Sequence, residues 1–138
     1  MYLIDTDVIS EARKGVKANA GVRGFFASAV RESTPLYLSV ITLGELRQGV
    51  ERIRYRGDRA QASTLERWLQ RVTAVYSDAI VPFEEETADI WGRLRVPHAE
   101  NPLDKQIAAT ALLYDLTVVT RNTVDYEPTG VRLLNPFS

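Results

Sequence analysis

Three acidic residues stand where an α/β protein places its ligand site. Asp5 ends the apolar run 2–4, and Glu45 follows the run 36–41, just inside the helix expected next. Asp104 opens a long apolar helix. Ligands of an open α/β sheet bind beyond the carboxyl ends of its strands, where helices start. Carboxylates gathered there repel one another unless a cation lies between them, and hard divalent cations prefer oxygen ligands. The pattern therefore predicts a metal-dependent site that acts on phosphate.

A fourth member of this acid cluster is expected in the segment 120–125, which follows a buried strand. Asp125 or Asn122 could reach the same edge of the sheet, and Asp125 is the candidate for a catalytic role. Thr120 could donate a hydrogen bond to a carboxylate and orient it. The structural alternative is a plain turn, because Asn and Asp are common turn residues.

Each of the three acids also has a purely structural explanation. Thr42-x-x-Glu45 matches a capping box, in which the glutamate only returns a hydrogen bond to its own helix start. Asn101-x-x-Asp104 is a comparable cap, with a proline in the first turn. Asp5 could cap the helix that follows the first strand. Three independent caps need not meet at one edge of a sheet, so a shared site explains the set better.

Thr6 and Asp7 directly follow the first acid and are candidate supporting residues of the site. Either could cap the helix expected at 6–14. Asp7 has a second interpretation, since it could instead be an outer member of the acid cluster.

The composition excludes several classes of protein. Hydrophobic residues make up 45% of the 138 and charged residues 25%, as in globular domains, and the net charge is −1. Apolar runs of about six residues are far shorter than the ~20 needed to span a bilayer, and no signal peptide is evident, so we expect a cytoplasmic protein without a membrane partner. The absence of cysteine excludes disulfides and thiolate metal sites. His98 is the only histidine, and we expect it in an exposed loop.

The hydrophobic periodicity predicts alternating strands and helices. Strands are expected at 2–5, 36–41, 117–120 and 131–134, with 79–83 either a short strand or an extended connection. Helices are expected at 6–14, 22–32, 42–56, 59–75, 84–95 and 103–114. This alternation implies an α/β fold with a mainly parallel sheet flanked by helices. We expect one domain over residues 1–138.

The two helices between residues 43 and 75 form an arm that combines apolar residues with several arginines. It is either a surface for a partner or an ordinary helical layer over the sheet. A run of charge is usually a solvated face, but a basic rim around an acidic metal centre would suit a polyanionic substrate. Arg47 in the arm and Arg121 after the 117–120 strand are the candidate substrate-binding residues.

Four segments resemble PIN-domain ribonucleases, especially the VapC-like toxins of bacterial toxin–antitoxin pairs. They are Tyr2–Ser10, Ser39–Leu46, Asp104 with 107–111, and Val119–Tyr126, in the order and at the spacing usual for that family. No single segment is specific, but the four together are, and they cover essentially the whole chain. Two departures stand out: position 7 is more often Asn in the family, and many relatives place an Asp nearer position 122, where this chain has Asn.

The resemblance implies a three-layer α/β/α sandwich and Mg²⁺ or Mn²⁺ held by Asp5, Glu45 and Asp104. It also implies cleavage of RNA phosphodiester bonds, dimerisation of the chain, and neutralisation by an antitoxin protein. That the substrate is RNA rather than DNA rests on the resemblance alone.

Two other functions compete with this hypothesis. Asp5-Thr6-Asp7 after an apolar strand also matches the nucleophile motif of haloacid-dehalogenase-like phosphatases, in which Asp5 would form an aspartyl-phosphate. That fold wants a separate lysine, for which Lys105 is a poor fit. The second alternative is a PIN fold that has lost activity and only binds a partner, which the retained acids argue against.

Overall fold

A five-stranded parallel sheet forms the centre of the computed structural model, which describes all of residues 1–138. Its strands are β1 (Tyr2–Ile4), β2 (Leu36–Ser39), β3 (Ile80–Val81), β4 (Thr117–Val119) and β5 (Leu133–Leu134), in the order β3-β2-β1-β4-β5. Every pairing between neighbours is parallel. The α/β prediction is therefore confirmed, and the ambiguous segment 79–83 contributes a two-residue edge strand just before Pro82.

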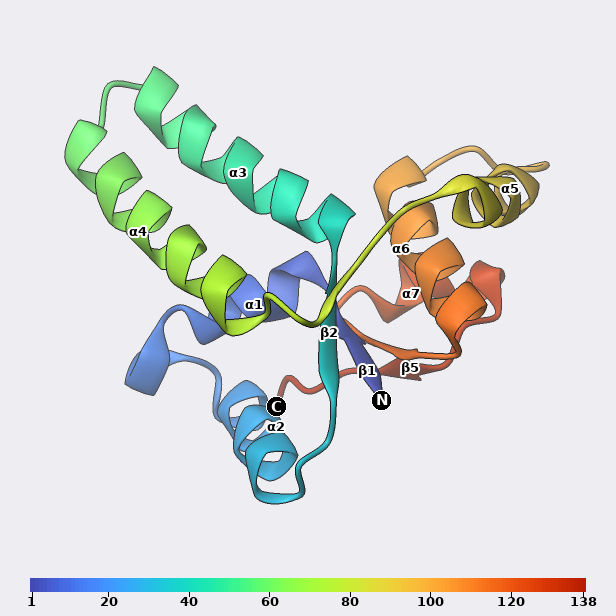
Figure 1. The fold of residues 1–138 in the computed structure, drawn as a ribbon, viewed down its shortest axis with the longest axis horizontal. Helices are drawn as coiled ribbons and strands as arrows, with labels where there is room; N and C mark the ends of the chain where they lie inside the picture. The colour runs from blue at the N-terminus through green and yellow to red at the C-terminus, as the bar shows by residue number, and fades with distance from the viewer.

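Helices cover both faces of the sheet (Figure 1). They are α1 (Thr6–Ala12), α2 (Ala20–Arg31), α3 (Val40–Tyr55), α4 (Arg59–Val75), α5 (Glu85–Leu94), α6 (Pro102–Tyr114) and α7 (Thr123–Tyr126), with 3₁₀ turns at Gly15–Lys17 and Glu127–Thr129. Successive strand residues point to opposite faces. Ile4 accordingly packs in one core with residues of α1 to α4, and Leu3 in a second core with Ile107 and other residues of α6. This is the predicted three-layer sandwich.

Helix α3 begins at Val40, two residues earlier than the sequence pattern predicts. The reason is local: the Ser39 side chain accepts a hydrogen bond from the backbone N–H of Ile41 and caps the helix there. Strand β2 consequently stops at Ser39. Thr42 lies inside the helix, so the capping-box explanation of Glu45 is wrong. Glu45 sits in the second turn rather than at the helix start.

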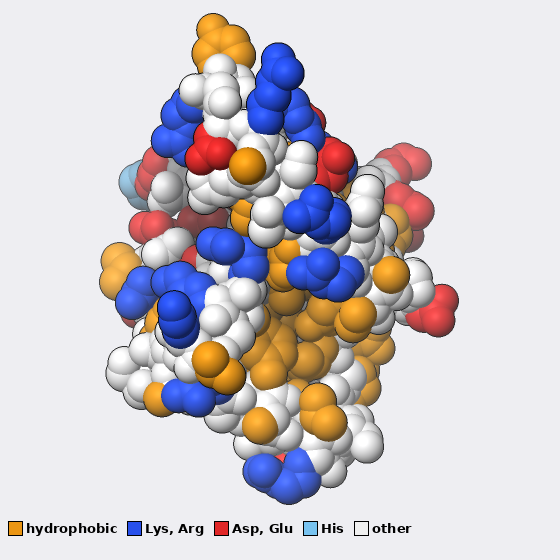
Figure 2. Space-filling model, turned by 90° about the vertical axis from the view of Figure 1, so that its left-hand side faces the viewer, with side chains coloured by type: hydrophobic (Ala, Val, Ile, Leu, Met, Phe, Trp, Pro, Cys, Tyr) orange, Lys and Arg blue, Asp and Glu red, His pale blue; other side chains and the backbone are white.

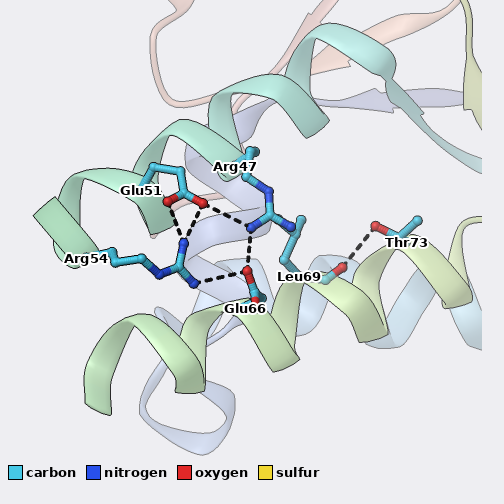
Figure 3. A network of polar contacts seen from close by, with 6 residues as sticks. All are labelled: Arg47, Glu51, Arg54, Glu66, Leu69 and Thr73. Carbon is cyan, nitrogen blue, oxygen red and sulfur yellow. Dashed lines mark hydrogen bonds and ion pairs between the residues drawn. The ribbon is translucent and has the colours of Figure 1, made fainter. Parts of the chain in front are cut away.

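Helices α3 and α4 form the arm, an antiparallel pair that extends away from the sheet (Figure 1). Leu46 and Val50 of α3 pack with Leu69 and Val72 of α4 in the larger core. On the outer side of the arm, Arg47 of α3 pairs with Glu66 of α4 at 2.6 Å. Arg54 pairs with both Glu51 and Glu66, which completes an ion-pair network between the two helices (Figure 3). The arm therefore buries one face inward, as an ordinary helical layer does.

No helix of the structure is both long enough and apolar enough to cross a membrane.

Candidate functional site

Asp5 lies at the carboxyl end of the central strand β1 and is almost completely buried. Its Oδ1 accepts a hydrogen bond from the backbone N–H of Thr6 at 2.8 Å, so the residue caps α1. Its Oδ2 accepts from the Thr120 hydroxyl at 2.8 Å and the Tyr126 hydroxyl at 3.0 Å. Burial raises the pKa of Asp5, and these hydrogen bonds offset part of that rise. Asp5 thus serves as both a cap and a fixed member of the acid cluster.

Glu45 reaches the same edge of the sheet from α3. Its Oε1 accepts a hydrogen bond from the Thr6 hydroxyl at 2.7 Å, while Thr42 lies 3.4 Å from that hydroxyl. Burial raises the pKa of Glu45, and the nearby charge of Asp5 adds to the rise. Thr6 therefore holds two acids at once, Asp5 through its backbone and Glu45 through its side chain.

Asp104 approaches from the opposite side, in the first turn of α6. Asn101 precedes that helix with a left-handed backbone (φ 54°), and its side chain makes no capping hydrogen bond, so the cap explanation is wrong for Asn101. Burial raises the pKa of Asp104 to about 6. The charges of four other acids, named in order of their effect, contribute to that rise: Asp5, Asp125, Glu45 and Asp7. The acids predicted from separate segments therefore share one electrostatic environment.

Asp7 stands at the rim of this cluster. Its Oδ2 accepts a hydrogen bond from the backbone N–H of Arg121 at 2.9 Å, whereas its Oδ1 is buried without a partner. Burial, followed by the charge of Asp5, raises the pKa of Asp7 to about 6. Asp7 is thus an outer member of the cluster and not the cap of α1.

Asn122 and Asp125 lie at the start of the short helix α7. The Asn122 backbone N–H donates to the Thr120 hydroxyl at 3.0 Å, but the Asn122 side chain makes no capping bond. Asp125 is exposed and close enough to Asp104 to raise its pKa. The side chain at 125 therefore contributes charge to the cluster, and its catalytic role stays a prediction.

The two candidate substrate-binding arginines have different surroundings. Arg47 is engaged with Glu66 at 2.6 Å and Glu51 at 3.5 Å on the arm. The Arg121 guanidinium lies over the Phe137 ring, 4.2 Å from its centroid, while its backbone holds Asp7. Arg121 is therefore beside the acids, and Arg47 is already paired. Substrate contact by either residue stays a prediction.

The family model of the PIN domain matches residues 2–126. This chain belongs to the PIN-domain family. Toxin FitB of Neisseria gonorrhoeae is 34% identical over 142 residues, covering 99% of both chains. VapC ribonuclease Y4jK of Sinorhizobium fredii is 28% identical, covering 99% of this chain and 98% of the relative. Among solved structures, that of FitAB bound to the IR36 DNA fragment superposes with a TM-score of 0.85 at 30% identity, over 100% of this chain and 96% of that one.

The acids of this PIN domain have the right chemistry for a hard divalent ion but do not form a closed ligand cage. No three acidic, histidine or cysteine side chains come together tightly enough to hold one ion. Mg²⁺ usually keeps several waters and binds through one or two carboxylates, so it does not need such a cage. Oδ1 of Asp7 has no hydrogen-bond partner, and burial followed by the charges of neighbouring acids raises the pKa values of Asp7 and Asp104. A cation at the cluster would offset both the missing contact and the repulsion between the carboxylates. The residues present therefore fit the ion.

Tyr126 is the residue of the PIN domain's site whose role the sequence did not reveal. It is fully buried, and its hydroxyl bonds Asp5. The residue lies within the segment 119–126 that carries the family resemblance, but a tyrosine in a short helix gives no sign of a carboxylate partner 121 positions away.

Proposed function

We propose that this chain is a single PIN domain over residues 1–138 that acts as a metal-dependent endoribonuclease, the toxin of a toxin–antitoxin pair. The observation that carries the proposal is the cluster formed by Asp5, Glu45 and Asp104 at the carboxyl edge of a parallel sheet, with Thr6 and Thr120 fixing two of them. The relatives named as a toxin and as a ribonuclease support the same activity.

Asp5, Glu45 and Asp104 would hold Mg²⁺ or Mn²⁺ directly or through water. When bound there, such an ion would polarise the scissile phosphate and lower the pKa of a coordinated water. The protein's own contribution is orientation, because Thr120 and Tyr126 both donate to Oδ2 of Asp5, whereas Oδ1 accepts a single hydrogen bond from the backbone N–H of Thr6. Preorganised ligands lose little freedom when they bind.

The start of α6 also favours a phosphate group at this edge. Backbone N–H groups at a helix N-terminus carry partial positive charge, and this effect falls off within the first turn. Asp104 lies in the first turn of α6, so the substrate would approach that helix end. Glu45 lies in the second turn of α3, so the dipole of that helix contributes less at this residue.

The proposed partners are RNA, an antitoxin protein and a second copy of this chain. Figure 2 shows the face of the molecule that carries the arm, where hydrophobic side chains form a continuous area bordered by Lys and Arg. Among the hydrophobic residues that pack against the larger core, Leu65 and Trp68 of α4 and Phe26 of α2 are only partly buried. An apolar area rimmed by charge marks a protein-binding surface. Light scattering at micromolar concentration tests the homodimer, and a monomer would count against it.

The phosphatase alternative receives less support from the contacts of its key residues. The Lys105 ammonium donates to the backbone carbonyl of His98 and not to any acid of the cluster. No observation favours phosphate release over cleavage of a nucleic acid chain.

A cleavage assay tests the proposal directly. Single-stranded and structured RNA are incubated with wild type and Asp5→Asn, with Mn²⁺, with Mg²⁺ or with excess EDTA. We expect internal cleavage by wild type only in the presence of metal, and a loss of several orders of magnitude in Asp5→Asn, because the substitution removes a ligand charge. RNA cleavage in EDTA would refute the metal requirement. Free phosphate without RNA products would indicate the phosphatase, and neither product would indicate a binding module.

A further inference from the structure

A cavity of about 270 Å³ lies next to the acid cluster, between the loop that precedes α6 and the segment 124–129. Val96, Pro97, Val124 and Pro128 contribute apolar walls. Lys105, Asn101 and Glu100 contribute polar groups. The lining thus combines apolar walls with charged and polar groups, and the polar groups would select what binds.

Lys105 is the unusual member of this lining, because only 4% of the residue is exposed. Its ammonium makes no ion pair with any carboxylate, and its one hydrogen bond goes to the backbone carbonyl of His98. An ammonium group has three N–H donors, so two remain unused. A buried charge is costly unless it is paired or fully hydrogen-bonded. The side chain is thus poised to donate to acceptors that enter the cavity.

Side-chain contacts connect one wall of the cavity to the rest of the protein. Arg95 stacks on Trp91, with its guanidinium carbon 4.8 Å from the ring centroid, and donates to the carbonyl of Ala99. The indole N–H of Trp91 donates to the carbonyl of Pro102 at 3.0 Å. Together with the bond from Lys105, these contacts hold the segment 98–102 at the carbonyls of His98, Ala99 and Pro102. A rigid wall lowers the entropic cost of binding.

Asp125 connects the cavity to the acid cluster. Its side chain lines the cavity, and its charge raises the pKa of Asp104. A ligand group in the cavity would therefore lie beside a phosphate positioned at Asp104. In an RNA chain, that group is the base of a nucleotide neighbouring the scissile bond.

We propose that this cavity binds an unstacked guanine base next to the scissile phosphate, an inference that rests on the proposed ribonuclease function. Guanine offers two acceptors, O6 and N7, to the two unused donors of Lys105. Its ring N–H and amino group would donate to the carboxylate of Glu100, and the faces of the base would contact Pro97 and Pro128. Adenine and cytosine carry an amino donor where Lys105 needs an acceptor. Uracil has one matching acceptor but lacks the amino group.

Binding of nucleoside monophosphates tests the pocket without requiring cleavage. Wild type, Lys105→Met and Glu100→Gln are titrated with GMP, IMP, AMP and UMP in EDTA, and amide chemical shifts are followed. Lys17→Met is the matched control, since Lys17 is exposed on the other side of the sheet and lines no part of the cavity. We expect GMP to bind wild type and the control more tightly than the other three. Lys105→Met should lose roughly 5- to 150-fold in affinity for GMP.

Glu100→Gln gives a second readout that does not depend on the buried lysine, because Glu100 is exposed and its replacement leaves the core intact. IMP lacks the amino group of guanine, so wild type should prefer GMP over IMP, and Glu100→Gln should reduce that preference. Equal binding of GMP and AMP by wild type, or unchanged GMP binding by both folded variants, would overturn the proposal.

Cleavage of RNAs that differ at a single nucleotide separates this proposal from the ribonuclease function itself. We expect wild type to cut beside guanosine fastest and Lys105→Met to lose that preference while still cutting other sites. Cleavage with no preference for guanosine in wild type would overturn the pocket and leave the ribonuclease standing. Lys105-dependent GMP binding without any RNA cleavage would support the pocket and count against the ribonuclease.

Discussion

Tyr126 donates its hydroxyl to Oδ2 of Asp5 at 3.0 Å, and so connects the short helix α7 to the end of the central strand. Both residues are buried, and Thr120 donates to the same oxygen at 2.8 Å. The hydrogen bond lowers the pKa of Asp5 against the opposing effect of burial. The tyrosine thereby helps to keep a buried carboxylate charged.

Replacing Tyr126 by Phe should destabilise the protein by about 1.5–3 kcal/mol, because a buried hydrogen bond to a charged group is lost while the ring still packs. The pKa of Asp5 should rise further, and RNA cleavage should fall most at low pH. Urea unfolding and a pH–rate profile measure the two effects. Tyr114→Phe is the matched control, since Tyr114 is partly exposed and its hydroxyl makes no hydrogen bond within the protein. Equal effects of the two substitutions would contradict the role of Tyr126.

Replacing Asp104 by Asn should leave the metal-free protein no less stable, or more stable by about 1 kcal/mol, because it removes one of several mutually repelling charges. The same substitution should abolish most of the stabilisation that Mn²⁺ gives to wild type, since a ligand stabilises by binding the native state. Thermal melts in EDTA and in Mn²⁺ measure both. A full metal-induced shift in Asp104→Asn would show that this carboxylate is not a ligand.

The stability of the metal-free protein should increase when the pH is lowered from 7 to 5. The pKa values of Asp7 and Asp104 are raised from 3.8 to about 6, mainly by burial, so between about pH 4 and 6 the native state binds more protons than the unfolded state. The free energy of unfolding therefore falls as the pH rises through that window. The gain should be on the order of 1 kcal/mol, after allowing for solvent screening of the half-buried Asp104.

Urea melts in EDTA at pH 5, 6 and 7 measure this effect. Asp7→Asn and Asp104→Asn should each flatten the dependence, because each removes one of the titrating groups. The lowered pKa values of Glu11 and Glu66 have the opposite effect, because they cause a loss of stability as the pH falls. That loss is confined to pH values near the ordinary pKa of a glutamate. A wild type whose stability rises steadily from pH 5 to 7 would contradict the predicted sign.

The fourth position of the cluster is decided by comparing Asp125→Asn with Asn122→Ala. If Asp125 supplies the fourth acidic group, Asp125→Asn should lower RNA cleavage about 100-fold or more at saturating metal, within the usual range for a group that assists proton transfer. Asn122→Ala should have a smaller effect, because only the backbone of Asn122 contacts the site residue Thr120. The opposite order would assign the role to Asn122.

Arg121→Gln should weaken RNA binding and lower its salt dependence by about one unit of slope, because it removes one phosphate-neutralising charge near the acids. Arg47→Gln should have a smaller effect on binding, since Glu66 and Glu51 already neutralise that guanidinium. Its effect on stability should also stay within about 1 kcal/mol, as for exposed ion pairs. Fluorescence anisotropy with labelled RNA at several salt concentrations distinguishes the two arginines. An equal loss of RNA affinity in the two variants would show that Arg47 also contacts the RNA.

The sequence alone determined the order of the elements and the edge of the sheet at which the acids lie. Strands β1 and β4 and the stretch 107–113 of helix α6 are mostly apolar, and short apolar runs of this kind indicate buried elements. Once the strands are parallel, Asp5, Glu45 and Asp104 must face the same edge, because each follows or opens an element there. The helix boundary at Ser39 was missed, since both Ser39 and Thr42 are good caps and the sequence does not rank them.

Only the tertiary structure decided which side chains hold the acids. Thr6 meets Glu45 from another helix, and Tyr126 meets Asp5 from the far end of the chain. The same is true of Arg47. The charge pattern gave no sign of an ion-pair partner for this residue, but in the folded arm it pairs with Glu66. Local periodicity reports whether a residue is buried and on which face. It carries no information about the partner, because that depends on how segments distant in sequence pack against one another.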